Sequence, residues 1–356
     1  MLSSSQVIFV FVHLPHKTYK TVSLSSISID SNSKMKKIKG ILFFWMLGFL
    51  ANAQETLPIY SDYLSDNVYL VHPAAAGIGN CGKLRLTARQ QWADIKDAPE
   101  LQTLSFHTRV GDKTGIGVIV FNDKNGYHSQ IGIQGTYAYH LDFGARSDEI
   151  NQLSFAFSMM MVENSVDETN FTIPDPVITQ LIQSRNYFNA DMGAAYHLGG
   201  FFSYITSKNI LLSARNLYND DFESLNLRRY LLTVGYYFGD NSSVQFEPSI
   251  MTQLVERTGE KFADFNLKVY KDFPSAQLWG GISYRQGFDG NELQELQYIT
   301  PIIGVNINKW MFSYTYTKQS GDILFENGGF HQISLGFNLL CRPQRLSGCP
   351  NINASF

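Results

Sequence analysis

The sequence is poor in charge, in cysteine and in long apolar runs. Only 17% of its 356 residues are charged, and the 28 basic residues do not outnumber the 31 acidic ones, which excludes a nucleic-acid binder. The longest apolar run, residues 41–51, has 11 residues against the roughly 20 that a membrane-spanning helix needs. With 44% hydrophobic residues the chain is too apolar for disorder. A soluble β-rich protein or a membrane β-barrel remains, and the 14% aromatic content favours the barrel.

The N-terminus has the features of an export signal. Three lysines precede the apolar run, and the small residues Ala51 and Ala53 follow it at the positions that a signal peptidase reads. We expect a signal peptide over residues 35–53 and an extension from an upstream start over residues 1–34. The alternative is an uncleaved anchor helix, which the short run disfavours. Without both segments, which hold six lysines and one aspartate, 22 basic and 30 acidic groups remain, a formal net charge of −8.

Polarity alternates with a period of two along the rest of the chain, as it does when side chains point to opposite faces of a sheet. In one segment Ile333, Leu335 and Phe337 share a face, while Gln332 and Ser334 share the other. Helical spacing is hard to find. We expect fourteen strands, at residues 84–92, 101–110, 115–122, 129–143, 151–163, 187–198, 208–216, 228–239, 243–256, 262–271, 275–287, 296–307, 309–318 and 329–340.

Strand length and loop rhythm favour an all-β, transmembrane antiparallel barrel of the outer-membrane type over a soluble sandwich. Many segments exceed the five or six residues usual in soluble sheets. Short turns alternate with long polar loops, as in barrels with both termini in the periplasm, and the connection at 199–207 is the exception. We expect a periplasmic N-terminal segment at 54–83, the barrel at 84–340 and a periplasmic C-terminal tail at 341–356.

Polar residues on the inward face fit a lumen that holds water, a plug or a ligand. An unpaired polar side chain in a dry core costs about 1–3 kcal/mol, so a lumen accommodates such residues at lower cost. The predicted lumen residues are Gln134, Gln245, Glu247 and Arg285.

The three cysteines are Cys81, Cys341 and Cys349. None has the spacing of a zinc or redox site, and export permits a disulfide. The first and last strands of a closed barrel are neighbours, so Cys81 and Cys341 should lie at one rim. We expect a disulfide from Cys81 to Cys341 or Cys349, with three free thiols as the alternative.

Four aromatic residues are candidates for the girdle that anchors a barrel at the lipid headgroups, with ordinary packing as the alternative. They are Trp92, Trp310, Tyr236 and Tyr237.

The sequence lacks the motifs of an enzyme, including a metalloprotease HExxH, a GxSxG elbow and a P-loop. Some barrels are lipid hydrolases with serine and histidine on the outer face, and Ser105 with His107 or His331 with Ser334 are pairs of that type. Such pairs arise by chance in β-rich chains. We therefore expect no catalytic residues, no cofactor and no metal.

Several motifs in order resemble the PorP/SprF family of outer-membrane proteins from Bacteroidetes. The first is LPIYSDYLSDNVYLVHPAAAG, ending at Gly77, in which His72 stands where asparagine is common. It is followed by LRLTARQQW, GIGVIVFND, YLLTVGYYFGD, FEPSIM, LWGGISYR, the strand 312–317, GGFHQISLGF and a closing Cys349-Pro350 with Phe356.

The resemblance implies a non-enzymatic outer-membrane component of the type IX secretion and gliding machinery. By this resemblance its partners are a large secreted adhesin-like cargo protein, the core or ring components of the secretion system and outer-membrane lipid. The segment 54–81 then lies on the periplasmic side or enters the lumen. The alternatives are a porin for small solutes and a lipid-modifying barrel enzyme.

Overall fold

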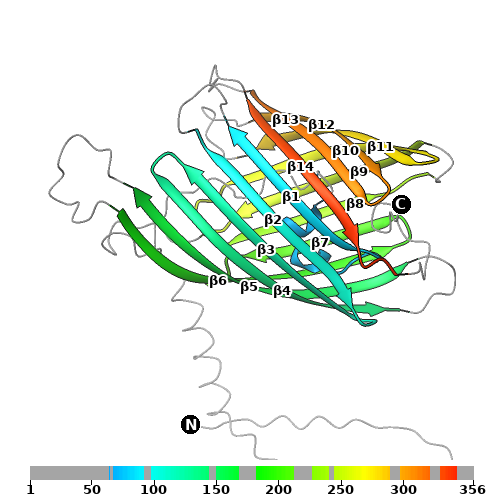
Figure 1. Ribbon diagram of the computed structural model, residues 1–356, viewed down its shortest axis with the longest axis horizontal. Coiled ribbons are helices and arrows are strands. Elements are labelled where there is room, and N and C mark those ends of the chain that lie inside the picture. The colour runs from blue at the N-terminus through cyan, green and yellow to red at the C-terminus, as the bar shows by residue number, and fades with distance from the viewer. Residues whose placement is uncertain are drawn as a thin grey trace, which may run out of the picture. The chain divides into compact units, whose positions relative to one another are not determined.

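The chain forms a closed transmembrane barrel of antiparallel strands (Figure 1). The computed structural model describes residue 64 and residues 67–91, 98–143, 150–167, 182–211, 227–239, 244–288, 297–320 and 329–342. No helix in these ranges is both long and apolar enough to cross a membrane. Two short 3₁₀ helices, η1 (Val68–Leu70) and η2 (Pro73–Ala75), precede the first strand.

The described wall contains fourteen strands, as the sequence predicts. They are β1 (Gly82–Gln91), β2 (Glu100–Val110), β3 (Thr114–Asn125), β4 (His128–Asp142), β5 (Asn151–Asp167), β6 (Ile182–Leu198), β7 (Phe201–Lys208), β8 (Arg229–Tyr236), β9 (Val244–Val255), β10 (Lys261–Phe273), β11 (Ala276–Gly287), β12 (Gln297–Ile307), β13 (Trp310–Ser320) and β14 (Phe330–Leu339).

Each strand pairs with its neighbours in sequence, and the barrel closes where β1 meets β14. This seam runs without interruption from Gly82 opposite Leu339 to Gln91 opposite Phe330. Closure leaves no free sheet edge, which is what a strand structure in lipid requires, because the hydrocarbon offers no hydrogen-bonding partner. The predicted fold class is confirmed.

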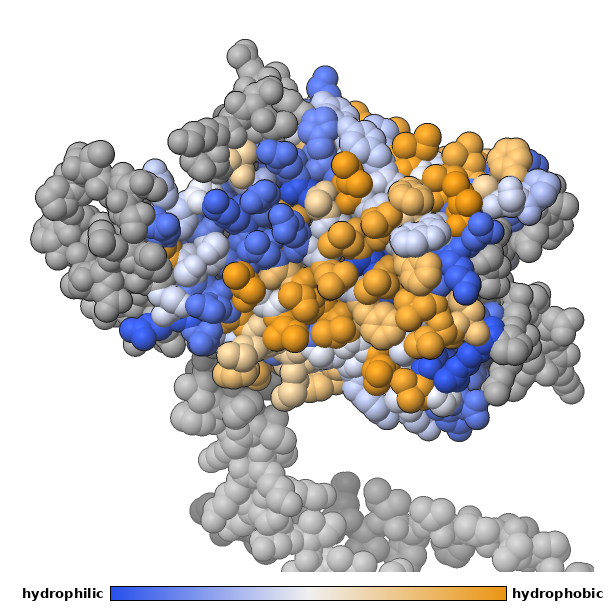
Figure 2. Space-filling model, viewed as in Figure 1, coloured by the Kyte–Doolittle hydropathy of each residue, from blue (hydrophilic) through white to orange (hydrophobic). Residues whose placement is uncertain are grey.

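The two faces of the wall differ as the period-two pattern requires. On β5 the outward side chains of Phe155, Phe157 and Met159 are exposed, whereas Ser154 and Ser158 face inward and are buried. Farther along β5 the outward face becomes polar from Glu163 onward. Figure 2 shows apolar side chains gathered over the middle of the visible face, with polar residues toward its ends. Such a band is suited to contact with lipid.

The predicted strand at 208–216 is misplaced in its described part, because β7 spans Phe201–Lys208, follows β6 after two residues, and is followed by residues 209–211 outside any strand. Residues 212–216 lie outside the described residues. The inward side chains Phe202 and Tyr204 are buried and apolar, so the strand lacks the contrast of polarity between its faces that marks the other strands. Gly199 in the turn has a φ of 54°, a conformation that glycine adopts without strain. The predicted long connection at 199–207 therefore does not exist.

The connections define two ends of the barrel. The short-turn end holds the links at 111–113, 143–150, 199–200, 237–243, 274–275 and 308–309. The long-loop end holds the links at 92–99, 126–127, 168–181, 209–228, 256–260, 288–296 and 321–329, of which 126–127 is unexpectedly a two-residue turn. β1 begins and β14 ends at the short-turn end, as expected of a barrel with an even number of strands.

A disulfide joins Cys81 to Cys341 at the short-turn end, across the seam between the first and last strands. Beside it, the Arg342 backbone N–H donates to the Asn80 carbonyl, and the Arg342 guanidinium donates to the Gly111 carbonyl. Cys349, the predicted extension at 1–34, the signal peptide at 35–53 and most of the predicted tail lie outside the described residues.

Removing the disulfide should destabilise the barrel, because the bond closes a loop with a sequence separation of 260 residues. For Cys81→Ser we expect a free energy of unfolding lower by about 3–5 kcal/mol. Denaturant unfolding in lipid vesicles, with and without reductant, measures the effect. Cys349→Ser is the control and should leave stability and the cross-linked peptide unchanged. A peptide map in which Cys81 is fully alkylated without reduction would contradict the bond.

A charge on the lipid face should be costly only within the apolar band. For Phe157→Arg we expect a loss of about 2–4 kcal/mol in the free energy of unfolding from vesicles, because the guanidinium replaces an apolar group in hydrocarbon. Gln102→Arg, outward on β2 and nearer the long-loop end, should cost about 0–1 kcal/mol. Equal losses for the two variants would mean that the band does not lie in lipid.

Candidate functional site

Residue 64 and residues 67–81 form a plug inside the barrel, seen as the blue coils of Figure 1. The structure thus selects the lumen over the periplasmic side for this part of the predicted segment 54–83. On one side Leu70 and the alanines of η2 pack against buried wall residues of β3 to β7. On the other side Leu64 and Val71 pack against a second buried cluster drawn from β8 to β13. The plug therefore contacts opposite sides of the lumen.

Small residues in the wall make room for the plug. A Cβ atom on Gly115 would collide with the Ala76 carbonyl oxygen, and one on Gly117 would collide with the Tyr69 phenol. Both glycines are on β3 and face inward. Gly77 has a φ of 76°, and a Cβ there would lie 2.6 Å from the Gly115 Cα. Backbone and plug approach more closely here than any larger residue would permit.

Hydrogen bonds attach the plug to four strands, β2, β4, β7 and β8. The contacts are Asn67 Nδ2 to Ser105 Oγ (3.0 Å), Tyr69 OH to Thr136 Oγ1 (2.8 Å), Lys208 Nζ to the Leu70 carbonyl (3.2 Å), His72 with Thr206 and Thr233 (2.8 Å each), His140 Nε2 with the Ala76 carbonyl (3.1 Å) and the Gly77 N–H to His107 Nδ1 (3.1 Å). Because a carbonyl only accepts, the proton of His140 is on Nε2.

Tyr69 is a buried aromatic residue of the plug and is only 1% exposed. Its hydroxyl donates to Thr136, whose hydroxyl is also 2.8 Å from Ser158 Oγ. Its ring lies 5.0 Å from that of His107. Burial raises the pKa of Tyr69, with Thr136 opposing the shift. The phenol is therefore neutral and acts as a donor.

His72 is fully buried between two threonine hydroxyls and stacks on Tyr204 at 5.0 Å between ring centroids. Burial lowers the pKa of His72 from its usual 6.5 to about 3, and the positive charge of Lys208 acts in the same direction. A neutral imidazole donates from one nitrogen and accepts at the other, which two hydroxyls can satisfy.

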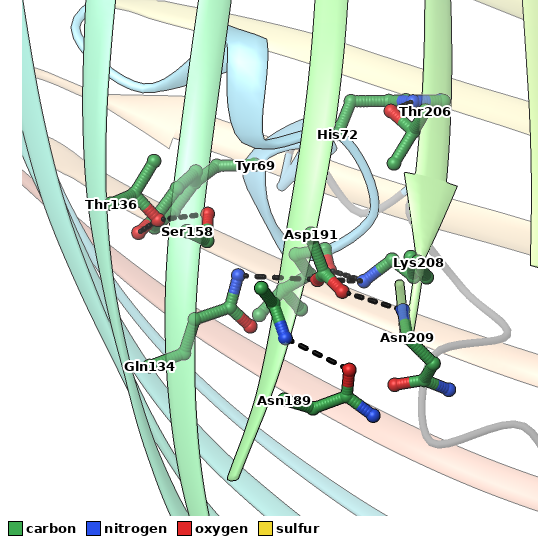
Figure 3. A network of polar contacts seen from close by, with 12 residues as sticks. Tyr69, His72, Gln134, Thr136, Ser158, Asn189, Asp191, Thr206, Lys208 and Asn209 are labelled. Carbon is green, nitrogen blue, oxygen red and sulfur yellow. Dashed lines mark hydrogen bonds and ion pairs between the residues drawn. The ribbon is translucent and has the colours of Figure 1, made fainter. Parts of the chain in front are cut away.

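A buried charge pair lies beside the plug (Figure 3). Lys208 Nζ is 3.7 Å from Asp191 Oδ2 while it donates to the plug carbonyl of Leu70. Asp191 also accepts from the Asn209 N–H at 2.9 Å and from Gln134 Nε2 at 3.5 Å. Both charges are nearly excluded from solvent, so removing one alone would leave the other uncompensated, at a cost of about 3–5 kcal/mol.

The predicted lumen residues all project inward from the wall. Gln134, Gln245 and Glu247 are buried, and Glu247 accepts from Tyr270 OH at 2.6 Å. Arg285 forms a bidentate pair with Asp264, at 2.6 and 2.8 Å. Gln134 donates to Asp191 of the charge pair beside the plug.

The residues weighed for catalysis have structural partners. Ser105 and His107 face the lumen and bind the plug through Asn67 and Gly77, so they do not lie on the outer face. Ser334 also faces inward and bonds Thr87 at 3.1 Å. Its suggested partner, His331, lies on the opposite face of β14, with Nδ1 2.7 Å from the Tyr314 hydroxyl. That pair is not a dyad.

Two of the predicted girdle residues, Tyr236 and Trp310, are exposed on the outer face at the short-turn end. The girdle remains a prediction for them. Tyr237 is wrong as a girdle residue, because it is buried and its ring lies 6.1 Å from that of Tyr270 in the inner cluster. Trp92 lies outside the described residues.

Three wall residues that hold the plug, Lys208, Thr206 and Thr233, were not predicted from the sequence, and neither was Asp191, which pairs with Lys208. A signal for Lys208 existed in the alternation along β7, where Phe202, Tyr204, Thr206 and Lys208 share the inward face. His72 was noted only as a departure from a family pattern. Nothing local in the sequence marks Asp191 as the partner of Lys208.

Acid should loosen the plug. In the released plug His72 regains a pKa near 6.5, whereas the docked value is about 3, so docking is strongest above pH 6.5 and is lost as the pH falls. The loss is about 1.4 kcal/mol per pH unit between pH 6.5 and pH 3. Hydrogen exchange of residues 67–78 in vesicles measures it. His72→Gln is the control, since in this variant only the pH dependence that comes from other groups should persist. If plug protection in His72→Gln changes with pH as steeply as in the wild type, His72 is not the source of the effect.

Solved structures similar to the chain include three barrel proteins. CdiB from Acinetobacter baumannii is 8% identical, with 73% of this chain and 60% of CdiB covered and a TM-score of 0.34. BamA from Haemophilus ducreyi lacking POTRA domains 1–3 is 8% identical, with 73% and 70% covered and a TM-score of 0.39. Omp33 from Acinetobacter baumannii is 8% identical, with 73% and 100% covered and a TM-score of 0.37. The chain spans about 60% of the length of CdiB.

A comparison with curated proteins gave no match. The family model described as "Type IX secretion system membrane protein PorP/SprF" matches residues 52–337, which include the plug and nearly the whole wall. The match and the plugged fourteen-strand barrel cover the same part of the sequence. The chain belongs to the PorP/SprF family of type IX secretion system membrane proteins.

Proposed function

We propose that this protein is a non-enzymatic outer-membrane component of type IX secretion, and that it is the partner through which a large adhesin-like protein is exported or attached at the cell surface. The observation that carries the proposal is the family match over residues 52–337. The short-turn end, with the plug and the disulfide, faces the periplasm in this proposal, since bacterial barrels have their short turns there.

The plug supports this role over that of an open porin. A solute porin needs a continuous aqueous path, whereas here Leu64, Leu70 and Val71 contact buried wall residues on both sides of the lumen. Of the residues considered for a lipid-modifying enzyme, Ser105 and His107 bind the plug. A secretion partner requires neither a permanently open lumen nor a catalytic group.

The proposed partners follow from the same assignment. At the short-turn end the protein is expected to associate with core or ring components of the secretion system, and at the long-loop end with its cargo. The lipid-facing band supports residence in the cell outer membrane, reached through the predicted signal peptide at 35–53. Gliding motility is the expected phenotype where the cargo is a motility adhesin.

Deletion of the gene should remove one large adhesin from the cell surface while other exported proteins remain. Surface labelling followed by mass spectrometry measures the display, and complementation with the wild-type gene should restore it. Complementation with Gly135→Leu should restore the display equally. Gly135 faces outward on β4, and a Cβ atom added there would meet no atom within 4 Å. A deletion strain that still displays and secretes every large adhesin would refute the role.

Affinity purification from cross-linked membranes should recover the cargo together with secretion components. Cells lacking the cargo gene serve as the control, since the machinery should still be recovered from them. Recovery of abundant porins alone, at equal yield in both strains, would argue against a dedicated partner.

A further inference from the structure

The plug is attached to the wall by side chains and contributes no strand to it. The described wall closes through β1 and β14 without any plug residue. The plug is covalently continuous with β1, and the Cys81–Cys341 disulfide fixes that junction at the rim. Withdrawal of residues 67–78 would therefore break none of the backbone pairing that holds the barrel in the membrane.

The wall surface behind the plug combines two apolar clusters with polar side chains that bind the plug directly. Most of its hydrogen-bonding atoms are hydroxyls and imidazoles that water can satisfy equally well. The wall groups that bind the plug directly are Ser105, His107, Thr136, His140, Thr206, Lys208 and Thr233. The desolvation penalty that normally keeps buried polar groups covered would thus be relieved by water if the plug left.

Lys208 is a charged wall group that would also keep a partner without the plug. Its ammonium is shared between the Asp191 carboxylate, which belongs to the wall, and the Leu70 carbonyl, which belongs to the plug. Loss of the carbonyl would leave the ammonium beside its carboxylate, so the wall retains charge balance in both states. A neutral carbonyl is also a weaker partner than a carboxylate.

We propose that the plug is a displaceable gate, and that the lumen becomes a water-filled, ion-conducting pore when the plug withdraws. This activity goes beyond the partner role, and it does not depend on which cargo the protein serves. The protein at rest is closed, which distinguishes the proposal from a porin.

The test uses glycine variants of the full chain reconstituted in planar bilayers. Gly115→Leu places a side chain where the Ala76 carbonyl lies and should expel the plug. Gly135→Leu, on the neighbouring strand and facing outward, is the matched control. We expect stable conductance steps from Gly115→Leu, and only rare openings from wild type and Gly135→Leu. Limited proteolysis within residues 67–78 should increase in the same variant that conducts.

A second variant leaves the wall untouched. Tyr69→Ala combined with His72→Ala removes the plug side of three hydrogen bonds and should also open the pore, so the outcome stands even if Gly115→Leu does not fold. Two results would overturn the proposal. One is a variant whose plug becomes protease-sensitive while its conductance stays at the wild-type level. The other is steady wild-type conductance with a protease-resistant plug.

Failure of the gate and failure of the partner role are separable. The conductance experiment uses purified protein in lipid without cargo, whereas the deletion experiment reads surface display in cells. A silent Gly115→Leu channel with an exposed plug would remove the gate and leave the secretion role unaffected.

Discussion

Closure of the sheet is the constraint on which everything else in this molecule depends. In hydrocarbon no water is present to pair with backbone N–H and C=O groups, so a strand edge left open would be costly. The seam from Gly82 opposite Leu339 to Gln91 opposite Phe330 satisfies that need along ten residue pairs. Once the wall is closed, its inward side chains must contact each other or whatever occupies the lumen, which is water, a plug or a ligand.

In this protein the lumen is occupied by the plug, residue 64 and residues 67–81 of the same chain. Fourteen strands enclose more space than their side chains fill, and the plug occupies it with a small apolar core and a shell of hydrogen bonds. The combination has two consequences for function. The plug contacts the wall on both sides of the lumen, and the wall groups that bind it are ones that water could satisfy if the plug left.

Most of the wall could be predicted because the signal for a barrel strand is local. A strand between lipid and a polar interior must alternate, and thirteen of the fourteen strands did so clearly enough to be placed. The failure at β7 has a physical reason. Phe202 and Tyr204 face the apolar part of the plug instead of water, so the inward face of β7 is apolar over its first half, and each face of the strand mixes apolar with polar residues. Tyr237 was misassigned for the same reason, since it faces an inner cluster.

The sequence by itself determined the architecture and the family, because a period of two, long strands and an ordered series of motifs are properties of neighbouring residues. Only the tertiary structure decided what the lumen contains. His72 meets Thr206 and Thr233 across 134 and 161 residues of chain, and Leu70 meets Lys208 across 138. Contacts at such separations leave no local pattern, since only the closed barrel brings these residues together.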